Sequence, residues 1–173
     1  MGYFRNRINL MSGSNAATLA GLRGHGGLIS AAAGTATGNM IEAGGLAAAF
    51  DGVTSQISTS CAQLANTSTA GTVGKDWGAG VTHTLKSCVV YGPNNFGIAR
   101  DTSNVSQSVT VTLEGSSDGS AWTSLTTAAS GSGSSAVLLF VPNSVTAYRH
   151  HRVSVAAFDS SSDKTIAEVQ FFE

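Results

Sequence analysis

Residues 109–125 read VTVTLEGSSDGSAWTSL, and this stretch decides the fold. Val109, Val111 and Leu113 alternate with polar residues, which is the period-two pattern of a strand with one buried face. The GSSDGS stretch that follows contains an Asp-Gly pair, which is typical of tight turns. A second short strand is expected over residues 122–125. The sequence therefore predicts an antiparallel β-hairpin here.

Further strands are expected on both sides of this hairpin, at residues 85–91, 137–141, 148–156 and 166–172. The first of them ends at a Gly-Pro-Asn-Asn turn. Turn signals return at short intervals, and this spacing is typical of an all-β sandwich or barrel.

The composition limits the classes of function. The 173 residues suit one domain with an appendage, and only 11% of them are charged, against a typical value of about 25%. A net charge of −1 gives no basic field for nucleic acid. The sequence has no run of about 18 apolar residues and no compact apolar segment near its start, so we expect neither membrane insertion nor export through a signal peptide.

Residues 1–40 differ from the rest, being rich in Gly, Ala, Ser, Thr and Asn. Such a segment buries too little apolar surface to offset its ordering entropy alone. We interpret it as an extended arm that docks on partner subunits, and the alternative is that it folds back on its own domain. Residues 41–173 would then form the globular domain.

Five motifs occur in a fixed order along the globular part. They are AAFDG at 48–52, DWGAG at 76–80 followed by TLKSCVVYG at 84–92, SSDGSAW at 116–122, RHHRV at 149–153, and AEV at 167–169. In this order they resemble the discoidin or coagulation factor 5/8 type C family, whose fold is galactose-binding-like. The resemblance covers about residues 42–173. His150 stands where the family often has Tyr, and the family's frequent terminal cysteine pair is absent.

The resemblance implies an eight-stranded antiparallel jelly-roll β-sandwich. Members of the family bind sugars, lipid head groups or proteins through loops at one end, and many hold a structural calcium ion. Carried over to this chain, the calcium ligands would include Asp51, Thr54 and Glu168. Calcium prefers six to eight oxygen ligands, several of them backbone carbonyls, which a sequence does not reveal.

A candidate glycan site surrounds the Gly-Pro-Asn-Asn turn. The aromatic rings of Tyr91 and Phe96 flank the amides of Asn94 and Asn95, a combination that suits ring stacking and hydrogen bonding to a sugar. The alternative is a hairpin loop with a tucked aromatic side chain.

Other striking side chains have simpler interpretations. For Trp77 and Trp122 we favour core packing over sugar stacking. The two adjacent histidines, His150 and His151, point to opposite sides of a strand, which argues against a shared metal ion. The family resemblance pairs Arg152 with a buried carboxylate. The two cysteines of the chain are expected to be buried thiols, with a single disulfide as the alternative.

No catalytic motif is present, neither a Gly-x-Ser-x-Gly elbow nor a His-Glu-x-x-His helix nor a phosphate loop, so we expect no enzyme activity and no catalytic residues. The main hypothesis is a multi-copy structural or decoration protein of a phage virion, in its capsid, neck or tail, made in the host cytoplasm. Its partners would be other virion proteins, contacted through the arm. The alternative is a carbohydrate-binding adhesin module that recognises host-surface glycans.

Overall fold

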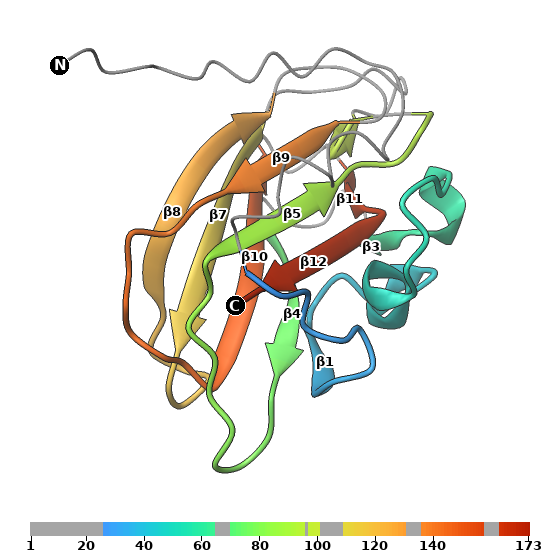
Figure 1. The fold of residues 1–173 in the computed structure, drawn as a ribbon. Coiled ribbons are helices and arrows are strands. Elements are labelled where there is room, and N and C mark those ends of the chain that lie inside the picture. The colour runs from blue at the N-terminus through green and yellow to red at the C-terminus, as the bar shows by residue number, and fades with distance from the viewer. Residues whose placement is uncertain (1–25, 65–69, 96, 101–108, 131–135, 158–162) are drawn as a thin grey trace, which may run out of the picture.

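The computed structural model describes residues 26–64, 70–95, 97–100, 109–130, 136–157 and 163–173. Within these ranges the chain forms two packed layers of antiparallel strands, with two short 3-10 helices at one side (Figure 1). The helices are η1 (Leu46–Phe50) and η2 (Ser58–Ser60).

One layer is a five-stranded sheet in the order β1-β4-β10-β7-β8. Its strands are β1 (Thr35–Gly38), β4 (Ala70–Asp76), β10 (His150–Ala157), β7 (Val109–Ser116) and β8 (Thr123–Ser130). Strands β7 and β8 are the predicted hairpin, with a register shift between Leu113 and Glu114.

The other layer contains a three-stranded and a four-stranded sheet. The first has the order β12-β5-β9, from β12 (Glu168–Phe172), β5 (Ser87–Tyr91) and β9 (Val137–Phe140). The second has the order β2-β3-β11-β6, from β2 (Glu42–Ala43), β3 (Ala62–Leu64), β11 (Asp163–Ile166) and β6 (Ala99–Arg100). The predicted all-β antiparallel jelly-roll sandwich is confirmed. The described strands number twelve rather than eight, because several short segments pair separately.

The core lies between the two layers. Alternate residues of the five-stranded sheet point inward, and Val73, Leu113 and Val153 are fully buried there. Phe140 and Ile166 from the opposite layer meet them. Burial of such a side chain stabilises the fold by about 1.5–3 kcal/mol.

A polar contact is built into this core. Trp77 Nε1 donates a hydrogen bond of 2.8 Å to Nδ1 of the fully buried His151. Burial, and then the charges of His83 and His150, lower the pKa of His151 to about 3. His151 is therefore neutral at neutral pH, and Trp77 is a core residue as the sequence indicated.

The described part of the predicted arm, residues 26–40, belongs to the jelly roll. Gly27 and Glu173 exchange backbone hydrogen bonds of 2.7 and 3.0 Å, β1 pairs with β4, and Met40 is fully buried. The boundary predicted at residue 40 therefore lies too far along the chain. The physical reason is that this Gly-rich stretch gains sheet hydrogen bonds, which need no large side chains. Residues 1–25 lie outside the described ranges, so their docking on partner subunits stays a prediction.

Cys61 and Cys88 are both buried free thiols, as the simpler interpretation had it. Burial raises the pKa of Cys61 to about 12 and raises that of Cys88 further. Among the described residues no helix has the length and apolar character to cross a membrane.

Candidate functional site

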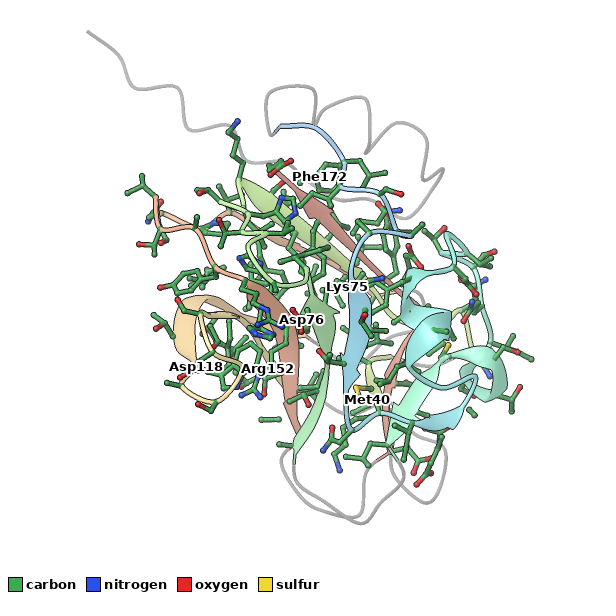
Figure 2. The ribbon with its side chains drawn as sticks, turned by 90° about the horizontal axis from the view of Figure 1, so that it is seen from below. Met40, Lys75, Asp76, Asp118, Arg152 and Phe172 are labelled. Atoms are coloured by element: carbon green, nitrogen blue, oxygen red, sulfur yellow. The ribbon has the colours of Figure 1, made fainter. Side chains whose placement is uncertain are left out.

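A groove of about 260 Å³ opens on the outer face of the five-stranded sheet. The sheet presents there the residues that alternate with the buried valines, and Figure 2 labels Arg152 and Asp118 on this part of the molecule. The lining residues are Thr37, Gly38, Thr72, Gly119, Trp122, His150 and Arg152.

Strand pairing explains why the groove forms here. Arg152 of β10 pairs with Gly74 of β4, and Gly74 pairs in turn with Thr37 of β1. A Cβ at Gly74 would overlap the carbonyl oxygen of His151 and lie 2.6 Å from the Cβ of Arg152. Glycine at position 74 therefore lets β10, with Arg152, pack closely against β4 beside the groove.

One wall of the groove is a stack of Arg152 on Trp122. The guanidinium carbon of Arg152 lies 3.8 Å from the centroid of the indole ring, a cation–π arrangement. Its Nε donates a 2.6 Å hydrogen bond to Glu114, the cross-strand neighbour on β7. The stack and the ion pair fix the guanidinium plane in place. The resemblance had assigned Arg152 a carboxylate partner, and Glu114, half-buried, fills that role.

The β7–β8 turn sets the position of Trp122. The Asp118 carboxylate accepts backbone hydrogen bonds of 2.8 Å from both Ser120 and Ala121, and Ser116 Oγ donates to it over 3.0 Å. These hydrogen bonds, above all the two from the backbone, hold the pKa of Asp118 far below its usual range. The ionised carboxylate closes the turn immediately before Trp122. The core placement predicted for Trp122 is wrong, because the ring is half-buried at the groove instead.

His150 connects the groove to a second ion pair. Arg149 makes a bidentate contact with Asp76, at 2.8 and 2.7 Å, and His150 Nδ1 lies 3.8 Å from the same carboxylate. The Arg149 hydrogen bonds, and then that of Gly78 N–H, lower the pKa of Asp76 to about 2. His150 Nε2 is buried and finds no hydrogen-bond partner among the described residues.

The loop proposed from the sequence as a glycan site makes hydrogen bonds to another loop of the chain. Tyr91 is only 4% exposed and packs in a core cluster, so its ring offers a sugar no open face. Asn94 Nδ2 donates to the Ser55 carbonyl over 2.8 Å, and Asn95 Oδ1 accepts from Ser58 N–H over 2.9 Å. Phe96 lies outside the described residues. In this geometry the two asparagines join loops to one another.

The predicted calcium ligands meet in part. Gly52 N–H donates to Glu168 Oε2 over 3.2 Å, which brings Glu168 to the loop that carries Asp51. Burial is the main cause that raises the pKa of Glu168 to about 7. The charge of Asp51 adds to the rise, while backbone hydrogen bonds from Gly52 and Asp51 oppose it. Gln56 Nε2 contacts Asp51 Oδ2 at 2.5 Å, while Gln56 Oε1 is buried with no partner in the described part of the chain. Thr54 is half-buried in the same loop.

Carboxylate and amide oxygens are ligand types that Ca²⁺ accepts, so Asp51, Glu168 and Gln56 would be the candidate ligands here. Within the described ranges no cluster of three or more His, Cys, Asp or Glu side chains is placed to hold a metal ion. A calcium ion here would therefore depend on amide and backbone oxygens beside Asp51 and Glu168.

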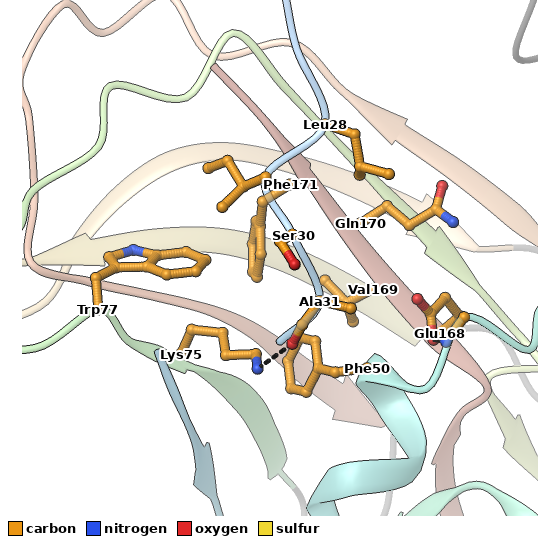
Figure 3. Close-up of a pocket in the computed structure, with 12 residues that line it drawn as sticks. Leu28, Ser30, Ala31, Phe50, Lys75, Trp77, Glu168, Val169, Gln170 and Phe171 are labelled. Atoms are coloured by element: carbon orange, nitrogen blue, oxygen red, sulfur yellow. Dashed lines mark hydrogen bonds between the residues drawn. The ribbon is translucent and has the colours of Figure 1, made fainter. Parts of the chain in front are cut away.

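A second, smaller cavity of about 80 Å³ lies beneath the N-terminal segment (Figure 3). Lys75 Nζ donates to the Ala31 carbonyl over 2.7 Å and lies 4.4 Å from the centroid of the Phe50 ring. Burial lowers the pKa of Lys75, opposed by the Glu168 charge. The amine thus anchors residues 28–31 to β4.

Sequence reasoning found some of these residues and missed others. The RHHRV motif singled out His150 and Arg152, but Glu114, Thr37 and Thr72 gave no signal as groove residues. Period-two alternation could have placed Arg152 and Glu114 on the outer faces of their strands. Only strand register brings Thr37 beside them.

Comparison with solved structures shows the fold. Among the similar structures is CBM62 from Clostridium thermocellum Xyl5A, with a TM-score of 0.56 and 20% identity over 80% of this chain and 93% of that chain. Chitosan-binding module 1 from a chitosanase/glucanase of Paenibacillus sp. IK-5 has a TM-score of 0.58 and 18% identity, over 84% of this chain and 99% of the module.

A third is a CBM32 module of Clostridium perfringens in complex with GalNAc-β-1,3-galactose. Its TM-score is 0.59 with 13% identity, over 85% of this chain and all of that one. Neither a protein-family model nor a curated protein sequence matches the chain. The chain thus shares the jelly-roll fold of these carbohydrate-binding modules.

Proposed function

We propose that the protein is a non-catalytic carbohydrate-binding module and that the groove on the five-stranded sheet binds the sugar. The observation that carries the proposal is the groove wall formed by Trp122, Arg152 and His150. The similar structures support it, because they are carbohydrate-binding modules.

The groove chemistry suits a polyhydroxylated ligand. Arg152 uses Nε for Glu114, and its terminal nitrogens carry further N–H donors. Thr37 and Thr72 add hydroxyl groups on the opposite wall. The charges of Arg152 and Arg149 are compensated by Glu114 and Asp76, so the groove carries little net charge. A ligand is therefore recognised by hydrogen bonds and ring contact.

The test compares wild type with Trp122→Ala on a glycan array, followed by titration calorimetry on the sugars that bind. We expect wild type to bind at least one glycan and the variant to lose about tenfold or more in affinity. Val145→Ala is the matched control, because Val145 is 90% exposed and does not line the groove. The proposal fails if wild type binds no glycan, or if Trp122→Ala binds as tightly as wild type.

The hypothesis drawn from the sequence, a structural protein of a phage virion, stays a prediction. The similar structures favour its alternative, the glycan-binding module, and nothing in the described fold depends on a phage particle. Assembly on virion proteins through residues 1–25 and location in a virion are both compatible with a glycan-binding domain.

We further propose a structural calcium ion beside Asp51 and Glu168, supported by the orphaned Gln56 oxygen. A bound ion would neutralise two adjacent carboxylates and stabilise the folded chain. At a calcium concentration of about 100 times Kd, we expect about 2.7 kcal/mol of added stability. Thermal unfolding with calcium and with a chelator measures it, and Asp51→Asn should remove the difference. Equal melting temperatures in both buffers would refute the ion.

A further inference from the structure

A row of small hydroxyl side chains crosses the outer face of the five-stranded sheet next to the groove. Strand register aligns Thr72 of β4, Ser154 of β10, Thr112 of β7 and Thr127 of β8 in one line. Thr72 also lines the groove, so the row begins where the groove ends. We call these four residues the hydroxyl row.

The hydroxyl row is open to a ligand. Thr127 is exposed and the other three side chains are half-buried. Asn39 Oδ1 accepts bonds from Thr72 N–H and Oγ1, at 2.6 and 3.2 Å, and the Thr112 and Thr127 hydroxyl oxygens lie 3.4 Å apart. These contacts orient the hydroxyls and leave each with capacity for further hydrogen bonds.

The neighbouring row runs through Gly74, Arg152, Glu114 and Ser124 and carries the Trp122–Arg152 stack. The hydroxyl row therefore lies beside this stack, and it shares Thr72 with the groove.

We infer that the site takes a linear oligosaccharide lying across β4, β10, β7 and β8, rather than a single terminal sugar. This inference rests on the proposed function. One sugar unit occupies the groove beside Trp122 and Arg152, and the following units lie on the hydroxyl row.

The dimensions support a chain longer than one unit. Adjacent strands are about 4.8 Å apart, so the row spans about 14 Å over three strand spacings. That length exceeds a single pyranose ring. Ser and Thr also lose little side-chain entropy when they are ordered by a ligand, in contrast to the Lys and Glu that commonly cover exposed sheets.

An ordinary solvated sheet face is the competing interpretation, since antiparallel sheets often expose one polar face. The two interpretations differ in their dependence on ligand length. A solvated face adds nothing to affinity, whereas a hydroxyl row that binds sugar units makes affinity rise as the chain grows.

The experiment measures calorimetric affinity for glucose, galactose, mannose and N-acetylglucosamine, each with its linear β-1,4-linked di- to hexasaccharides. The blocking variant is Thr112→Lys, which places a long cation in the middle of the hydroxyl row. The matched control is Thr110→Lys, on the same face of the same strand but one row beyond it. Thr112→Ser, which keeps the hydroxyl, should retain wild-type behaviour.

We expect affinity in at least one series to rise about tenfold or more with length. Thr112→Lys should abolish that rise and spare the monosaccharide affinity, while Thr110→Lys keeps both. If the monosaccharide binds as tightly as its oligomers, or if Thr112→Lys keeps the rise, the hydroxyl row is no subsite and the proposed function still stands. If wild type binds no sugar of any length, the proposed function and this inference both fail.

Discussion

The inner and outer faces of the five-stranded sheet are made from the same strands, yet they differ in kind. On β10 the inward Val153 and Val155 are fully buried, while the alternating Arg152 and Ser154 face outward and remain half-exposed. The inner face is fixed by packing against the opposite layer. The outer face is released from that constraint and is free to carry a binding surface.

The inner face is not purely apolar, and this refines the comparison. His151 and Lys75 both point inward, each with a specific hydrogen bond to satisfy it. The outer polar groups on β10 and β4 are ion-paired or hydroxyl-bearing instead. The inner face therefore supplies most of the stability, and the outer face supplies the candidate site.

The largest expected difference between the faces is in core packing. Leu113→Ala, on the inner face, should lower the free energy of unfolding by about 2–5 kcal/mol, because it leaves a cavity in a fully buried site. Its outward neighbour Thr112→Ala should change it by less than about 0.5 kcal/mol. Chemical denaturation of both variants measures the contrast. Equal losses would mean that the outer face is as structural as the inner one.

The next effect concerns the close packing of β4 against β10 beside the groove. Gly74→Ala should lower the free energy of unfolding by about 1–3 kcal/mol, because the added methyl group overpacks against β10. Gly27→Ala is the control, since a Cβ there meets nothing within 4 Å. Denaturant unfolding of the two variants measures the free energies of unfolding. A Gly74→Ala protein as stable as wild type would show that β10 can move away from β4.

An acid-dependent difference should come from the buried histidine. His151 has a folded-state pKa of about 3 against 6.5 for an ordinary histidine. Between these values the unfolded chain binds a proton at this position that the folded chain does not. The free energy of unfolding should therefore fall as pH decreases from about 6.5 toward 3, by at most about 1.4 kcal/mol per pH unit from this group.

His151→Gln tests this contribution, because an amide can still accept the Trp77 bond but does not titrate. Unfolding curves between pH 7 and 4, for wild type and variant, should diverge progressively as the pH falls. Since His83 and His150 face His151 and remain in both proteins, the difference isolates His151. Parallel curves would indicate that His151 binds its proton equally well in the folded and unfolded states, which contradicts the lowered pKa.

The smallest expected effect is the coupling between Arg152 and Glu114 on the outer face. Both side chains are partly exposed, at 26% and 19%, so a double-mutant cycle should give a coupling of about 0.2–1 kcal/mol. The pair then orients the guanidinium for a ligand and contributes little to stability. A coupling well above that range would make the ion pair part of the structural framework.

Local patterns predicted the fold well. The alternation around Val111 and the Asp-Gly turn at Asp118 predicted an antiparallel hairpin, and the resemblance of the five motifs to a known family implied the jelly roll. These features are readable because a strand with one buried face must alternate, and a tight turn must use residues that tolerate it. The core position of Trp77 followed from the family resemblance, and the buried thiols followed from the usual burial of free cysteine.

The candidate site was harder to predict. Tyr91 and Asn95 looked like sugar contacts, but tertiary packing buried the ring of the first and used the amide of the second to join two loops. Trp122 looked like a core residue, but the turn held by Asp118 carries it to the surface beside Arg152. In each case the residue type suited both roles, and its neighbours in space made the choice.

The sequence by itself determined which residues alternate, where turns fall and how little charge the chain carries, because these properties depend on neighbours a few positions away. Tertiary structure alone decided that Thr37, Gly74, Arg152 and Glu114 share one row, and that residues 26–40 complete the domain. The physical reason is strand register. A shift of one residue between β4 and β10 would turn the outward side chains of one of these strands to the core, and only the packing of the whole sandwich fixes that register.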